Sequence, residues 1–119
     1  MSHHFERGKV LLEQGRFAEA AKEFRQTLAQ DPNHAFALAL LAECQIAEKD
    51  FAKAIEYSEQ AVGLEPNKPL FLYIMARAYF YSQNTRRARE IIAEGLRLNP
   101  TDADFYLLPV VFIKIDVAS

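Results

Sequence analysis

The sequence predicts an all-α fold, an α-solenoid built from three antiparallel helix pairs. The strongest observation is a fixed period, because Pro32, Pro66 and Pro100 follow one another at intervals of 34 residues. A constant period of this size is typical of repeat arrays, in which one unit cannot bury its apolar face alone. Two further observations support the prediction. Small residues recur in phase with the prolines, and apolar residues recur at helical spacing inside the units.

The small residues predict where helices cross. Small side chains let two helix axes approach closely, and larger side chains fill the gaps beside them. The recurring small positions are Gly8, Ala42 and Ala76; Ala20, Ala54 and Ala88; and Thr27, Ala61 and Gly95. Large apolar residues recur at Leu28, Val62 and Leu96, and aromatic residues recur at Phe17 and Phe51 but not at Thr85.

The first unit has the pattern of two helices. Residues 1–14 carry an apolar stripe that Gly15-Arg16 interrupts. Residues 17–29 follow with apolar side chains at i, i+3, i+4, i+7 and i+11, which is the spacing of one helix face. Asp31-Pro32 ends this second helix, because the residue before a proline is pushed out of the helical region.

The second and third units repeat this division, with turns expected at Lys49-Asp50 and at Gln83-Asn84. The predicted units are residues 1–34, 35–68 and 69–102, and the chain length favours one domain overall.

Residues 103–119 depart from the pattern. Residues 103–108 begin like a capping helix, but Pro109 removes a backbone donor, and the β-branched, apolar residues 110–117 favour a strand over a helix. Three explanations stay open. The tail folds back over the third unit, it pairs with a second copy to give a homo-oligomer through the C-terminal end, or the chain is a piece of a longer array. Of these explanations, we favour self-association through the C-terminal end.

Composition excludes several classes of function. The net charge is −2, and this gives no reason to expect nucleic acid as a partner. A membrane span is not expected, because no apolar stretch reaches about 18 residues. Residues 1–14 lack the apolar core of a signal peptide. The single cysteine, Cys44, excludes an internal disulfide and is expected to be buried in a helix, which fits a cytoplasmic location.

No chemistry-bearing motif is present. There is no Gly-rich phosphate loop, no paired metal-ligand motif and no Ser/His/acid arrangement, so neither an enzyme nor a cofactor is expected. His3 and His4 are adjacent and point about 100° apart on a helix, which predicts no metal site. His34 is expected to be a solvated turn residue. Glu13, Glu19 and Glu23 are expected on solvated helix faces.

The unit resembles the tetratricopeptide repeat (TPR) family, whose known period is 34 residues. Ala20 and Phe24 are four residues apart, Pro32 follows eight residues later, and Gly8 lies twelve residues before Ala20. The segments 14–20 and 28–33 are close to the family consensus, and the likeness covers residues 1–102. The resemblance implies a right-handed superhelix, a TPR superhelix, in which the first helix of each pair lines an inner, concave groove.

On that mapping, the groove candidates share one helix face at i, i+3, i+7 and i+10. They combine apolar anchors with one charge in each unit. The candidates are Phe5, Lys9, Leu12, Phe36, Glu43, Ile46, Leu70, Tyr73, Arg77, Phe80 and, at the edge, Tyr81.

The predicted function is a non-enzymatic protein–protein interaction module, an adaptor or scaffold that binds a peptide or one helix. The alternatives are a chaperone for a secreted or aggregation-prone client, and one domain excised from a larger repeat protein. For any single aromatic residue, packing between helices is an equally good explanation.

Some TPR proteins bind the acidic C-terminal tails of heat-shock chaperones through Lys, Asn and Arg side chains that clamp two carboxylates. The matching positions here are Phe5, Lys9, Leu40, Leu70 and Ile74. Only Lys9 has a suitable charge, and it stands in place of an asparagine. The sequence therefore predicts that this chain has no carboxylate clamp.

Overall fold

The computed structural model describes residues 3–100, and over that range it contains six α-helices and no strand. The all-α prediction is confirmed for these residues. The predicted capping segment 103–108 and the apolar segment 110–117 lie outside the described residues. The helices are α1 (His4–Glu13), α2 (Phe17–Gln30), α3 (Ala35–Ala47), α4 (Phe51–Leu64), α5 (Pro69–Tyr81) and α6 (Thr85–Leu98).

The same tight turn joins the two helices of each pair. One residue in each turn has left-handed backbone geometry, with φ of 75° at Gly15, 65° at Lys49 and 73° at Gln83. The next residue donates its N–H to a carbonyl five positions back, at 2.8–2.9 Å in all three turns. Glycine adopts the left-handed region without steric cost, whereas a residue with a Cβ does not. The repeat therefore imposes its geometry even where the turn residue is not glycine.

Side chains cap three of the helices. Asp50 and Asn84 accept hydrogen bonds from backbone N–H groups in the first turns of α4 and α6, each at 3.2 Å. His34 does the same for α3, because its Nδ1 accepts from the Ala37 N–H at 3.1 Å. The expectation of a solvated turn residue was therefore wrong for His34, which is half-buried and whose ring packs at a tilt against Phe5, with centroids 4.6 Å apart.

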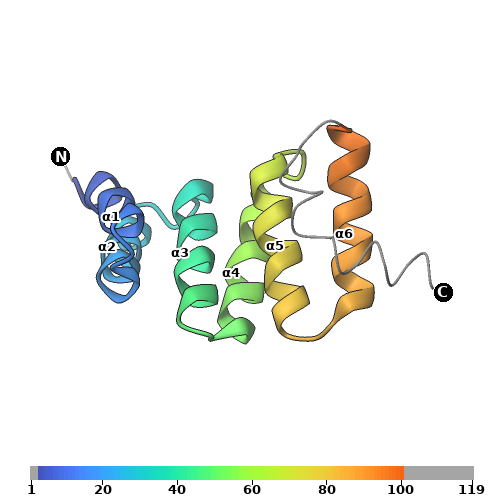
Figure 1. Cartoon of the computed structure of the whole chain (residues 1–119). Coiled ribbons are helices and arrows are strands. Elements are labelled where there is room, and N and C mark those ends of the chain that lie inside the picture. The colour runs from blue at the N-terminus through green and yellow to red at the C-terminus, as the bar shows by residue number, and fades with distance from the viewer. Residues whose placement is uncertain (1–2, 101–119) are drawn as a thin grey trace.

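The three pairs stack side by side into an elongated array (Figure 1). Helix α3 packs against its partner α4, against α2 of the preceding pair and against α5 of the following pair, and more lightly against α1. The first helices of the pairs, α1, α3 and α5, thus form one layer. Helices α2, α4 and α6 form the other layer and pack mainly on the first helices. This is an all-α solenoid of helix pairs.

The core lies where the recurring small residues meet. Gly8 and Ala42, with the small residues that follow in phase along the chain, are buried, as the period predicts. The largest fully buried side chains include Phe24, Phe71 and Leu41. Leu28 and Val62, on second helices, each pack against two neighbouring apolar clusters. These residues make the core continuous from one pair to the next. Cys44 is buried as predicted, and burial raises the pKa of its thiol to about 12.

One expected surface carboxylate instead ties α1 to α2. The Glu23 side chain is only 18% exposed, and its Oε1 lies 2.9 Å from His4 Nδ1 and 3.1 Å from Arg7 Nε. The hydrogen bond with His4, followed by the contact with Arg7, lowers the pKa of the Glu23 carboxyl. The expectation of a solvated helix face was wrong for Glu23. Glu13 and Glu19 are exposed, as expected.

Two glycine substitutions test the helix crossing. A Cβ added at Gly8 would lie 2.5 Å from Cε1 of Phe24, so Gly8→Ala must displace a fully buried ring. We expect it to lower the free energy of unfolding by about 1–3 kcal/mol. Gly63→Ala meets no atom within 4 Å in α4 and is the matched control, expected to add about 0.5 kcal/mol. Urea denaturation of both variants measures the difference. Equal effects of the two substitutions would contradict the crossing.

Candidate functional site

The layer of first helices carries the candidate residues, and we call its exposed surface the first-helix face. Ten of the eleven groove candidates predicted from the sequence are at least partly exposed on it. Leu70 and Tyr81 are the most exposed apolar members, at 38% and 44%. Ile46 is buried at 7% exposure and belongs to the core. The remaining members are half-buried, namely Phe5, Lys9, Leu12, Phe36, Glu43, Tyr73, Arg77 and Phe80.

Aromatic rings connect the three units near one end of this face. Phe5 and Phe36 have centroids 6.3 Å apart, and Phe36 lies 5.3 Å from Phe71 with its edge against that ring. These contacts come from α1, α3 and α5, so part of the aromatic area packs between helices. Leu70 neighbours Phe71 in sequence, but its side chain is exposed.

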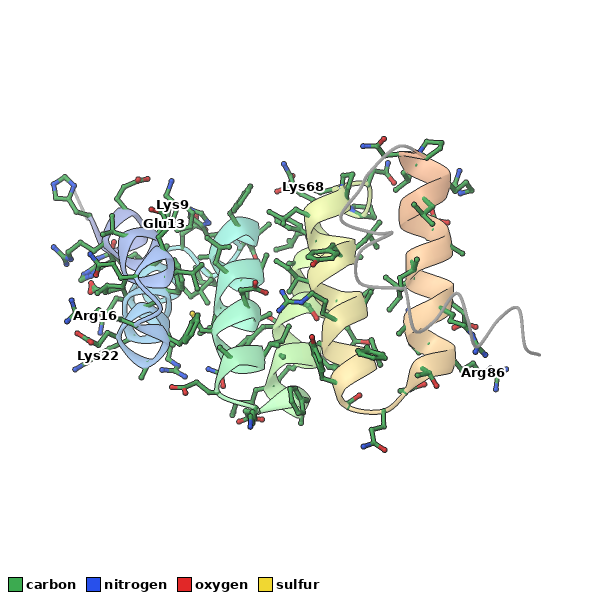
Figure 2. The ribbon with its side chains drawn as sticks, viewed as in Figure 1. Lys9, Glu13, Arg16, Lys22, Lys68 and Arg86 are labelled. Atoms are coloured by element: carbon green, nitrogen blue, oxygen red, sulfur yellow. The ribbon has the colours of Figure 1, made fainter. Side chains whose placement is uncertain are left out.

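Two lysines cover these rings. Lys9 Nζ lies 5.0 Å from the Phe5 centroid, and Lys68 Nζ lies 5.3 Å from that of Phe36. In Figure 2 both lysines lie toward the upper edge of the array, on α1 and at the start of α5, whereas Arg86 lies at the opposite edge. Cations over ring faces are attracted by the ring quadrupole. Each of these lysines also has a carboxylate nearby, Glu6 at 3.2 Å from Lys9 and Glu65 at 3.8 Å from Lys68.

An ion pair crosses the middle of the face. Arg77 Nη1 donates to both carboxylate oxygens of Glu43, at 2.7 and 2.5 Å. Burial alone would lower the pKa of Arg77, but the hydrogen bond and charge of Glu43 raise it overall. The guanidinium also lies 5.5 Å from the centroid of Tyr73. Two of the three charges predicted for the groove therefore neutralise each other, which periodicity alone could not show.

A cavity of about 250 Å³ lies at the other end of the face, between the α3–α4 turn and the end of α5. Phe51 and Tyr81, which both line it, stack on each other with centroids 5.9 Å apart, and Phe80 and Tyr81 are arranged edge to face at 5.2 Å. We call this space the Tyr81 cavity. Its lining residues are Ile46, Ala47, Lys49, Phe51, Arg77 and Tyr81.

Sequence reasoning missed three residues of this surface, Lys49, Phe51 and Lys68. Phe51 was assigned only to the repeat pattern, and Lys49 only to a turn. The signal that could have found them is the repeat itself, because stacking places the turn of one pair beside the first helix of the next. Lys68 lies directly before α5, so its ammonium can reach rings on two first helices.

Four of the five positions that would form a carboxylate clamp are apolar, and of these only Leu70 is exposed. Ile74 is 2% exposed within the core, Leu40 is half-buried, and Phe5 contacts other rings. Lys9 is the only cation of the set, and its Nζ lies 3.2 Å from a carboxylate oxygen of Glu6. The described residues thus offer no pair of cations at these five positions.

Neither a metal site nor a membrane-spanning helix is found within residues 3–100. No group of three or more His, Cys, Asp or Glu side chains in that range could hold a metal ion. No helix in that range is long and apolar enough to cross a bilayer.

A double-mutant cycle tests the Glu43–Arg77 pair. Glu43→Gln and Arg77→Met should show a coupling free energy of about 1–2 kcal/mol, because both side chains are largely buried, at 28% and 20% exposure. The exposed pair Glu94–Arg97 is the control, and its coupling should be much weaker, because solvent screens both charges. Denaturant unfolding of the single and double variants gives both values. Equal coupling in the two pairs would show that the cross-unit pair adds no special stability.

Solved structures share this fold. The first TPR domain of Spaghetti (RPAP3), bound to the HSP90 peptide SRMEEVD, has a TM-score of 0.88 at 22% identity, over 98% of this chain and 91% of that one. The Sgt2 TPR domain from Aspergillus fumigatus has a TM-score of 0.86 at 21% identity, over 97% and 78%. MamA has a TM-score of 0.79 at 24% identity, over 92% and 64%. At these identities the likeness concerns the fold alone.

Sequence comparison identifies the family directly. No curated protein sequence matches this chain. One sequence model described as tetratricopeptide repeat matches residues 5–69, more than half of the chain, and a second with the same description matches residues 45–108. The six helices fit three such repeats. The chain therefore belongs to the tetratricopeptide repeat family.

Proposed function

We propose that this chain is a non-enzymatic protein–protein interaction module, an adaptor or scaffold whose first-helix face binds a peptide segment or one helix of a partner. The observation that carries the proposal is the exposure of Leu70 and Tyr81 on α5. In a repeat array, apolar residues that neither the pair nor the neighbouring unit covers are free to contact a partner. Leu70 and Tyr81 lie at opposite ends of one helix, so an occupant in contact with both spans its length.

Contacts that restrict the side chains of the first-helix face also support the proposal. Tyr73 and Arg77 contact each other, and Glu43 fixes the guanidinium. Side chains held in this way lose little further freedom when a partner binds, which lowers the cost of association. Tyrosine and arginine are also enriched among residues that dominate binding energy.

The occupant should differ from the ligand of the similar structure. The peptide SRMEEVD carries adjacent glutamates and a C-terminal aspartate, and it is bound by the first TPR domain of Spaghetti. Here Leu40, Leu70 and Ile74 occupy positions where the clamp places cations or amides. A more apolar segment is the better match for this face.

A chaperone function is the second candidate and stays a prediction. The chaperone alternative requires a client and a dimer built from the ends, and the tail that would build it lies outside the described residues. A cytoplasmic location is likewise a prediction.

Matched leucine substitutions test the proposed face. Peptides selected from a random displayed library on the wild-type chain should lose about tenfold in affinity for Leu70→Ser, because an apolar contact is removed. Leu64→Ser on α4 is the control, since Leu64 is 43% exposed but lies on a second helix. Its affinity should change by less than about twofold. Fluorescence polarisation gives both values. Equal losses of affinity in the two variants would show that the peptides bind elsewhere. Peptides whose affinity is unchanged by Leu70→Ser would show the same.

The acidic peptide SRMEEVD tests the specificity. We expect no micromolar binding to this chain at physiological salt, because the clamp positions carry one cation, Lys9, which is already paired. Isothermal titration calorimetry measures the affinity, with the TPR domain of Spaghetti as the positive control. Micromolar binding by this chain would refute the assignment of an apolar rather than an acidic ligand.

A further inference from the structure

The Tyr81 cavity has the size for one side chain of a ligand. Its volume of about 250 Å³ lies below the range of about 300–1,000 Å³ that is typical of small-molecule pockets. Its walls are apolar and aromatic, since Ile46, Phe51 and Tyr81 line it. A bulky apolar or aromatic side chain would bury its surface here and could stack beside the Phe51–Tyr81 pair, as aromatic rings prefer.

The charged residues around the cavity favour a particular charge in the ligand, next to the side chain that enters the cavity. Both charged residues in the lining are cations, Lys49 and Arg77, and no carboxylate lines it. Glu48 and Asp50 flank Lys49 in sequence but are not among the lining residues. Arg77 is neutralised by Glu43 through Nη1. Within residues 3–100 no ion pair or hydrogen bond engages the Lys49 ammonium, so Lys49 is the available positive charge.

The position of Lys49 is fixed by the turn. Its backbone is left-handed, and its N–H donates to the Ile46 carbonyl at 3.0 Å. The equivalent turn residues are Gly15 and Gln83, so only the middle unit carries a charge there. The Cβ costs some stability in this conformation, yet it gives the cavity lining a lysine that the other two turns lack.

We propose that the Tyr81 cavity is a subsite for a bulky apolar or aromatic side chain of the bound peptide, with an acidic residue next to it in the ligand that pairs with Lys49. This inference rests on the proposed function and deepens it. It names one anchor of the ligand and the charge that accompanies that anchor. A single acidic residue inside the peptide is a different requirement from the two carboxylates of an acidic C-terminal tail.

Blocked dipeptides test the subsite without knowledge of the natural partner. The probes are N-acetyl-Phe-Glu-amide, N-acetyl-Phe-Lys-amide and N-acetyl-Ala-Glu-amide, titrated at millimolar concentration into the ¹⁵N-labelled full chain. Phe-Glu should shift amide signals around Ala47, Lys49, Phe51 and Tyr81. Its affinity should exceed that of Phe-Lys by a factor of about two to five, the range for an exposed ion pair. Ala-Glu should produce much smaller shifts.

Charge reversal supplies the control. Lys49→Glu should reverse the preference, so that Phe-Lys binds better than Phe-Glu. Lys53→Glu should leave the preference unchanged, because Lys53 is exposed in the first turn of α4 and does not line the cavity. Phe-Glu shifts that are absent or that map elsewhere would overturn the subsite, as would a preference that Lys49→Glu leaves unchanged. If the subsite fails while selected peptides still lose affinity for Leu70→Ser, the face stands and only its ligand is wrong.

Discussion

The close crossing of the two helices in each pair is the constraint on which the rest of the structure depends. Gly8 leaves room for the Phe24 ring, and a Cβ there would lie 2.5 Å from it. In the other pairs Ala42 and Ala76 fill the equivalent position, and both are fully buried. Because each pair is closed by the same turn at the same crossing, successive pairs stack in one manner. The first helices consequently share one layer, and their outward residues share one face.

Stacking also determines how charge is distributed on that face. Lys9, Glu43 and Arg77 occupy the same position in three successive units, and stacking brings the second and third of them into contact. Glu43 and Arg77 have opposite signs and form a pair across α3 and α5. This contact fixes an arginine on the face while cancelling its charge. Over the described part of the chain, the unpaired positive charge then lies at one rim, at Lys49, whereas Lys68 over the rings near the other end lies 3.8 Å from a carboxylate oxygen of Glu65.

Much of the fold could be predicted from the sequence, because the 34-residue period repeats the same pattern of small and apolar residues in three units. The helix pairs, their turns and the buried small residues followed from it. Contacts between units were harder to predict, since the period places Glu43 and Arg77 at equivalent positions but gives no distance between them. His34 and Glu23 were misjudged for a related reason. Each is polar and lies near a helix end or on an outer face, and only the packing of α1 on its neighbours buries them.

The ligand class is coupled to stability as well as to surface chemistry. A fold of this kind supports many functions, so the likeness to a domain bound to SRMEEVD does not carry its ligand over. The difference between this chain and a clamp-bearing domain includes a buried residue. Ile74, at a clamp position, is 2% exposed and packs in the core with Ala42 and Phe71. A cation in its place would be buried without a partner, which destabilises the fold strongly. The packing that holds α3 against α5 therefore opposes recognition of a two-carboxylate tail, which agrees with the proposal that the ligand is a more apolar segment.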